Sequence, residues 1–223
     1  MFSKGEKLLW AASSALIILS FIVFDRENWL CLAASIIGVT SLIFAAKGHP
    51  VGPGLMVVFS LIYGYISLSF RYYGEMLTYV GMTLPMSVAA LFAWLRNPYR
   101  SGKPEVKVAS LKVREWGFMW LSTIAVTVIF FFILRALGTA NLLPSTISVT
   151  TSFAAVHLTW RRSPYYALAY AANDVVLIIL WLMAAAVDRA YLSVAVCFAA
   201  FLVNDLYGFA SWRRMARRQS AGG

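Results

Sequence analysis

Long apolar stretches, separated by short polar segments, follow one another along the whole chain. Stretches of about 17–25 mostly apolar residues predict membrane-spanning helices, because a helix of that length crosses the hydrocarbon core of a bilayer. Eight such stretches are present, at residues 8–24, 28–46, 54–70, 77–95, 117–134, 144–160, 164–187 and 190–212. The segments between them are short except for residues 96–116, which are rich in Lys and Arg. The pattern predicts an all-α integral membrane protein with eight transmembrane helices in one compact membrane domain.

The composition and the distribution of charge agree with this interpretation. Hydrophobic residues make up 61% of the chain and charged residues 13%, whereas soluble domains carry about 25% charged residues. If both termini are cytoplasmic, 15 of the 19 Lys and Arg residues fall on the cytoplasmic side, and Arg26, Arg71, Arg135 and Arg189 fall outside. The positive-inside rule therefore predicts cytoplasmic termini. It also explains the net charge of +10 without a nucleic acid partner. The terminal "RRMARR" is expected to touch anionic membrane lipid.

Two similar segments predict an internal repeat. The fourth stretch ends in "MSVAALFAWLRN" and the eighth in "NDLYGFASWRRM", which aligns Trp94 with Trp212. Short basic turns with a proline, "KGHP" and "RRSP", precede the third and seventh stretches. Residues 28–95 and 144–212 would then be two three-helix units in parallel orientation, joined by a basic loop and a linker helix at 96–143. An extra helix at 1–27 precedes them, and a basic cytoplasmic tail at 213–223 follows.

Two Asn-Asp pairs interrupt the last two apolar stretches. They are Asn173 with Asp174 in "YAANDVVLIILW" and Asn204 with Asp205 in "FLVNDLYGF". A charged carboxylate at the bilayer centre costs about 2.5–3.5 kcal/mol on insertion scales, so such residues face the protein interior or a water-filled cavity. We expect the two pairs to lie at similar depth and to line one cavity. Helical spacing adds aromatic residues to the face that carries the first pair, namely Tyr166, Tyr170 and Trp181.

This combination of side chains suits a nucleoside-like ligand. Aromatic rings stack on a flat base, and a cationic base gains a further cation–π attraction. Amides and carboxylates hydrogen-bond to ribose hydroxyls and base edges. The candidate substrate-binding residues are Asn173, Asp174, Asn204, Asp205, Tyr166, Tyr170, Trp181, Tyr63 and His157. Other roles remain open for the same residues: interhelical hydrogen bonds for the amides, structural or proton-coupling carboxyls, interfacial anchors for the tyrosines, and a core position for His157.

No motif for catalysis, metal or cofactor binding is found. The chain has two His residues and no Cys-x-x-Cys motif, which argues against a metal site. A nucleophile elbow, a paired-aspartate protease motif and a phosphate-cradling glycine loop are also lacking. We therefore expect a protein that is not an enzyme and needs no cofactor. An intramembrane hydrolase built on His157, Asp174 and Asp205 is the alternative of another class.

Between residues 28 and 212 the chain resembles the PnuC family of bacterial vitamin transporters. The resemblance rests on the order and spacing of "ENWLCLAASIIGVTSLIFAAKG", "SLIYGYISLSFRYYGEM", "LPMSVAALFAWLRNP" and "NDLYGFASWRR". It implies a three-plus-one-plus-three helix arrangement like that of SWEET sugar transporters, with 8–24 as an extra helix. It further implies a homotrimer in the bacterial inner membrane. Members carry nicotinamide riboside, thiamine, riboflavin or deoxynucleosides by facilitated diffusion, and a cytosolic kinase traps the substrate.

One position departs from the pattern of the nicotinamide riboside carriers. Those members have a W-x-x-W pair shortly before an Asn, where this chain has Tyr166 and Ala169 before Asn173. The resemblance implies nicotinamide riboside, or a closely related nucleoside-like vitamin, as the substrate. A deoxynucleoside is the first alternative, followed by thiamine or riboflavin.

Overall fold

The structure is a computed structural model, and it describes residues 2–69, 73–139 and 141–221. The long helices are α1 (Lys4–Phe24), α2 (Trp29–Ala46), α3 (Val51–Ser69), α5 (Leu84–Leu95), α6 (Val113–Ala136), α7 (Leu142–Trp160), α8 (Tyr166–Ala185) and α9 (Leu192–Ala221). A short helix, α4 (Tyr73–Met76), continues into the π-helix η1 (Leu77–Thr83) and then into α5. A 3-10 turn, η2 (Arg189–Tyr191), precedes α9. The expected all-α membrane fold is confirmed.

The predicted spans and the helices agree closely. Within the described residues, seven helical segments are long and apolar enough to cross a membrane. The eighth predicted span corresponds to α7, which has 19 residues and carries many Ser and Thr side chains. The third predicted span ends at Phe70, which lies outside the described residues together with Arg71 of the charge count. The last helix runs further than expected, because α9 continues through the basic tail to Ala221.

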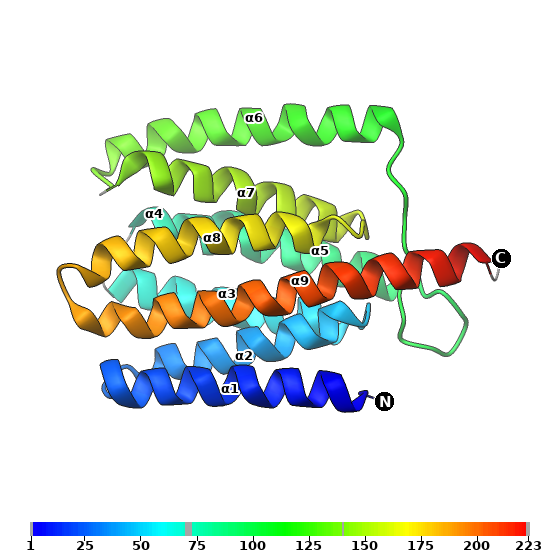
Figure 1. Cartoon of the computed structure of the whole chain (residues 1–223). Coiled ribbons are helices and arrows are strands. Elements are labelled where there is room, and N and C mark those ends of the chain that lie inside the picture. Colours follow the sequence, from blue (N-terminus) through cyan, green and yellow to red (C-terminus); the bar gives the residue numbers. More distant parts are fainter. Residues whose placement is uncertain (1, 70–72, 140, 222–223) are drawn as a thin grey trace.

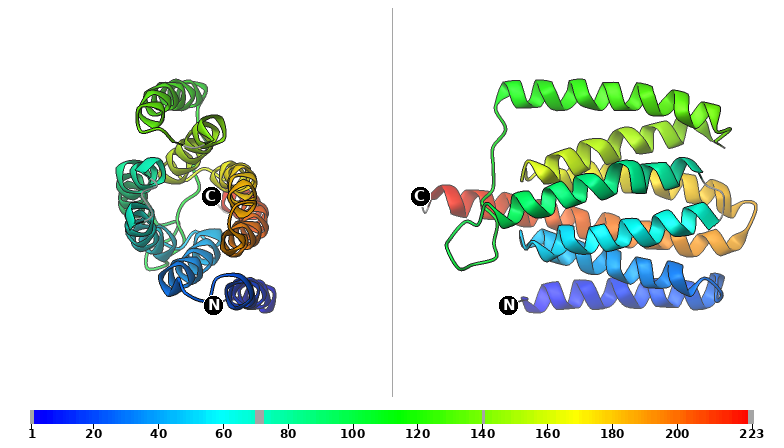
Figure 2. Two further views of the ribbon diagram at one scale, coloured as in Figure 1. Left: turned by 90° about the vertical axis from the view of Figure 1, so that its left-hand side faces the viewer. Right: turned by 180° about the vertical axis from the view of Figure 1, so that it is seen from behind.

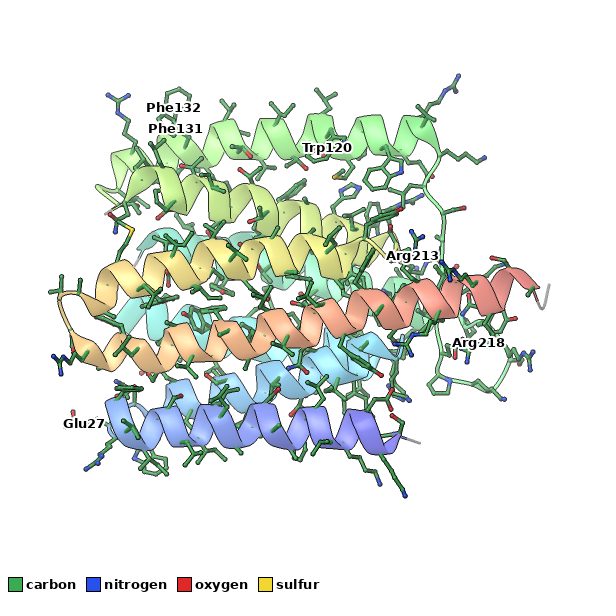
Figure 3. All side chains as sticks on the ribbon, viewed as in Figure 1. Glu27, Trp120, Phe131, Phe132, Arg213 and Arg218 are labelled. Atoms are coloured by element: carbon green, nitrogen blue, oxygen red, sulfur yellow. The ribbon has the colours of Figure 1, made fainter. Side chains whose placement is uncertain are left out.

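The helices α2, α3, α5, α7, α8 and α9 form a closed ring, in which each packs against the next and α9 packs against α2. Viewed end-on, this ring surrounds the axis of the molecule (Figure 2, left). Two helices lie outside it: α1 packs on α2 and α9, and α6 packs on α7. Most large apolar residues of α6, such as Trp120 and Phe132, are exposed on its outer side (Figure 3). That surface suits contact with lipid.

Both termini and the loop after α5 lie at one end of the bundle, here called the basic end (Figure 1). The loops after α1, α6 and α8 lie at the other end, here called the opposite end (Figure 1). At the basic end a capping box begins α1, in which Ser3 and Glu6 satisfy each other's backbone amides. The last turns of α9 are fixed there too, because Arg218 contacts Glu105 at 2.5 Å.

The turns that follow α2 and α7 have the same construction. Gly48 and Arg162 both adopt positive φ, at 64° and 57°. In each turn this residue donates its amide to a carbonyl three positions back, Ala45 in one and Thr159 in the other. Each turn then reaches a proline two residues later, Pro50 or Pro164. These matched turns support the predicted repeat of α2, α3 and α5 in α7, α8 and α9.

Candidate substrate-binding site

The ring contains a large cavity toward the opposite end. Its volume is about 690 Å³, which lies in the range of pockets that bind small molecules. A second cavity of about 90 Å³ adjoins it and shares part of its wall. We call the two cavities together the hollow. The residues that line both are Tyr63, Glu75, Trp181, Asp188 and Tyr191.

One face of α8 runs from the hollow toward the basic end. Leu177 and Trp181 line the large cavity. Tyr166 and Tyr170, two to four turns further along the helix, line a small pocket of about 20 Å³ nearer the basic end. Asp174 lies between these two groups at helical spacing and is only 3% exposed. The aromatic face predicted from the sequence therefore points into the ring, with a carboxyl group at its middle.

The carboxyl groups of Asp174 and Asp205 are hydrogen-bonded to each other. Both are 3% exposed, so the two aspartates of the Asn-Asp pairs meet as expected. A hydrogen bond between two carboxyl groups requires a proton, so the pair carries at most one negative charge. The Oδ2 atom of Asp174 has no partner among the described residues. A buried acceptor without a partner is costly, and it is free to accept from a ligand.

Asn173 is engaged by the neighbouring helix. Its Oδ1 accepts hydrogen bonds from three hydroxyl groups of α7, at 2.9–3.1 Å. The donors are Ser148, Thr151 and Ser152. Two of them, Ser148 and Ser152, also line the large cavity. Asn173 thus fixes α8 against α7 beside the hollow.

Asn204 faces α1 instead of the hollow. Its Nδ2 donates to the Ser13 hydroxyl and to the Ala200 carbonyl, both at 2.8 Å. Its side chain is 1% exposed and lines none of the three cavities. The expectation that both Asn-Asp pairs line one cavity therefore holds for the aspartates, while Asn204 holds the extra helix on the ring.

Aromatic rings form much of the wall of the hollow. The rings of Tyr63 and Tyr79 lie 4.5 Å apart between centroids, and Phe59 stacks on Tyr63 at 5.4 Å. Across the hollow, Trp181 contacts Tyr191 at 5.4 Å. Flat aromatic surfaces at the edge of a polar cavity suit a flat heterocyclic ring. Tyr63, proposed from the sequence as the counterpart of the α8 face, is part of this wall.

His157 lies away from the hollow. It is 4% exposed and packs among Phe118, Phe153 and Trp160, with ring centroids 5.5–6.0 Å away. It lines none of the three cavities. The structure thus places His157 between α6 and α7 and does not bring it near Asp174 or Asp205, which removes the geometric basis for a hydrolytic site built on these three residues.

The ring is closed toward the basic end by an aromatic cluster. Trp94 and Trp212 lie 5.2 Å apart between centroids and are at most 1% exposed. Tyr166 packs on both, at 6.4 Å and 5.0 Å. The small pocket next to Tyr166 is therefore separated from the basic end, whereas the hollow reaches the loops of the opposite end.

Several lining residues were not recognised from the sequence. Glu75, Thr78 and Tyr79 come from α4 and η1, a segment that the sequence analysis assigned partly to a loop. Their spacing of three and four residues is a helical signal that could have placed them on one face. On α7, Ser148 and Ser152 form a second polar face at helical spacing. Short hydroxyl side chains are common in apolar helices, which is why this face was overlooked.

A ring of apolar helices around a polar, aromatic hollow defines a multi-pass membrane protein with a site for a small molecule. Residues 28–214 match the family model described as nicotinamide mononucleotide transporter. The chain is 25% identical over 203 residues to a nicotinamide riboside transporter PnuC of Neisseria mucosa, covering 89% of this chain and 77% of that protein. It is 24% identical over 216 residues to the one of Haemophilus influenzae, covering 96% and 92%.

A solved structure shows the same fold. The crystal structure of the vitamin B3 transporter PnuC superimposes with a TM-score of 0.84, covers 98% of this chain and 94% of that chain, and shares 21% sequence identity. The chain belongs to the nicotinamide mononucleotide transporter family. The resemblance to PnuC transporters found in the sequence is confirmed.

Proposed function

We propose that this chain is an uptake transporter for nicotinamide riboside or a closely related nucleoside-like vitamin. The observation that carries the proposal is the hollow of about 690 Å³ within a ring of membrane helices, lined by aromatic rings, hydroxyl groups and carboxyl groups. The relatives described as nicotinamide riboside transporters support this substrate class. The chain acts by facilitated diffusion in the bacterial inner membrane, and cytosolic phosphorylation traps the substrate.

Within this proposal the basic end faces the cytoplasm, as the positive-inside rule requires. The hollow then opens toward the outside, and the cluster of Trp94, Trp212 and Tyr166 closes the route to the cytoplasm. The substrate passes Asp174 and Tyr170 on its way inward along the face of α8. The protein is a homotrimer, an assembly for which the exposed apolar surface of α6 provides contact area.

In this proposal Asp174, Tyr63 and Trp181 contact the substrate. The buried Oδ2 of Asp174 accepts a hydrogen bond from a ribose hydroxyl, because no described group supplies a donor to it. Tyr63 and Trp181 stack against the heterocyclic ring. Asp205 holds the Asp174 carboxyl in place, and Asn173 positions α8 against α7.

A panel of ligands tests the substrate class. Thermal unfolding of the purified protein is measured with nicotinamide riboside, thymidine, thiamine and riboflavin. A ligand at 100 times its dissociation constant stabilises the folded state by about 2.7 kcal/mol. A clear rise in melting temperature with nicotinamide riboside is expected. If no compound of the panel raises it, the proposed substrate class is wrong.

A further inference from the structure

Acidic side chains line the hollow, and basic ones are missing from its wall in the part of the chain that the structure describes. Asp25, Glu75 and Asp188 line one or both cavities, and no Lys, Arg or His does. The chain as a whole carries a net charge of +10, so this local excess of acid runs against the overall balance. A cleft lined by one sign of charge within low-dielectric walls concentrates ions of the opposite sign.

Of the three carboxylates, Glu75 is the one that is not engaged by the protein. Asp25 accepts from the Asn28 amide group at 2.7 Å, and Asp188 accepts from the backbone amide of Ala190 at 2.9 Å. These two carboxylates hold the turns in which they lie. Glu75 has no hydrogen bond or ion pair within residues 2–69, 73–139 and 141–221, and it lines both cavities.

Aromatic rings surround the Glu75 carboxylate. Its charge acts on both Tyr63 and Tyr79, whose rings lie 4.5 Å apart. Trp181 lines both cavities together with Glu75. The faces of Trp and Tyr rings attract cations, and a carboxylate beside them adds the counter-charge. The arrangement therefore fits a flat ring that carries a positive charge.

A buried hydroxyl group gives an independent sign that a ligand binds here. Ser67 lies one helical turn from Tyr63 on α3 and lines the smaller cavity. It is 1% exposed, and its Oγ has no hydrogen-bond partner among the described residues. A buried polar group normally has a partner, so this hydroxyl is positioned to bond to a polar group that enters the cavity.

We propose that Glu75 is the specificity-determining group of the hollow and selects substrates with a positively charged ring, such as a pyridinium or a thiazolium. This inference rests on the proposed transport function and narrows its substrate class. Nicotinamide riboside and thiamine carry such a ring, whereas deoxynucleosides and riboflavin have uncharged ring systems. Glu75 therefore separates the substrates that the sequence leaves open.

The test compares two forms of one molecule that differ in ring charge. Uptake of nicotinamide riboside and of its uncharged dihydro form is measured in proteoliposomes that contain the full chain. The wild type is expected to prefer the cation by about ten-fold in KM, which corresponds to about 1.4 kcal/mol. Glu75→Gln should remove this preference by raising KM for the cation alone. The matched control is Glu27→Gln, because Glu27 is exposed at the same end and lines neither cavity (Figure 3).

Each outcome supports or overturns the inference. If the wild type handles both forms equally, or if Glu75→Gln keeps the preference, Glu75 is not the selecting group and the transport function stands. If Glu75→Gln does not fold, Glu75→Asp is compared with it, and loss of the preference in this charge-conserving variant overturns the inference. Uptake of thymidine or riboflavin without uptake of either cation overturns it as well. Failure of all these compounds to bind or to move refutes the proposed transport function and the inference together.

Discussion

Trp94 and Trp212 exchange hydrogen bonds across the two halves of the ring. The Trp94 indole donates to the Thr159 carbonyl at 2.9 Å, and the Trp212 indole donates to the Ala45 carbonyl at 2.7 Å. Thr159 and Ala45 are each the second-last residue of α7 and α2. Each half of the chain therefore ties its last helix to the first helix of the other half. This reciprocal contact closes the ring at the basic end and is the strongest structural support for the predicted repeat.

Replacing one of these tryptophans should weaken the closed end of the ring. Trp212→Phe keeps a ring in the cluster but leaves the buried Ala45 carbonyl without its side-chain donor. We expect a loss of about 1–3 kcal/mol in the free energy of unfolding, seen as a lower melting temperature. Trp120→Phe is the control, because Trp120 is 40–60% exposed on α6, at 54%. Equal melting temperatures for the two variants would show that the Trp212 hydrogen bond contributes little.

Asp174→Leu should impair binding and leave the fold intact. Leu has a similar size, and the substitution removes a buried polar atom that has no protein partner. The desolvation cost of the carboxyl group disappears with it, so stability should change by less than about 1 kcal/mol. Affinity for nicotinamide riboside, measured by calorimetry, should fall at least about ten-fold, or 1.4 kcal/mol. Normal affinity in a well-folded Asp174→Leu protein would exclude Asp174 from the site.

The neighbouring position provides a matched comparison. Asn173→Leu introduces the same side chain but removes the acceptor for three hydroxyl groups of α7. Its main effect should be on stability, with a loss of about 1–3 kcal/mol. Thermal unfolding of the two Leu variants side by side separates a binding role from a structural one. If Asn173→Leu is as stable as Asp174→Leu, the hydrogen bonds to α7 do not hold α8 in place.

Binding of a cationic ligand should depend on pH near neutrality. Glu75 precedes the span at Leu77–Leu95, and its withdrawal from water raises its pKa to about 7. Only the ionised form attracts a cation, so affinity should rise as pH increases through 7 and fall as pH decreases. Between pH 6 and pH 8 the ionised fraction grows from about one tenth to about nine tenths. Binding curves at several pH values should show this rise in the wild type and not in Glu75→Gln. A wild-type affinity that is flat across this range contradicts a role for Glu75.

The sequence was sufficient to predict the helices and the main face of the site. Apolar runs longer than a bilayer is thick leave few alternatives to membrane helices. Helical spacing then placed Tyr166, Tyr170, Asp174 and Trp181 on one face, and a carboxyl group in an apolar helix indicated that this face points inward. These features follow from one helix at a time, without knowledge of its neighbours.

The features that depend on neighbouring helices were not predictable in the same way. Asn204 precedes Asp205 just as Asn173 precedes Asp174, yet it faces α1, because the packing order of the helices decides what lies on each face. Glu75 was missed because the π-helix η1 departs from the spacing of 3.6 residues per turn. His157 looked like a site residue on α7, and only the position of α6 shows that its surroundings are aromatic.

The central claim is that the hollow carries a substrate across the membrane unchanged. The direct measurement is uptake of labelled nicotinamide riboside into liposomes that contain the purified protein, followed by chemical analysis of the label inside. The account predicts saturable entry that stops when internal and external concentrations are equal, with the label recovered as intact nicotinamide riboside. Entry no faster than in liposomes without protein, or recovery of a cleaved product, would contradict it.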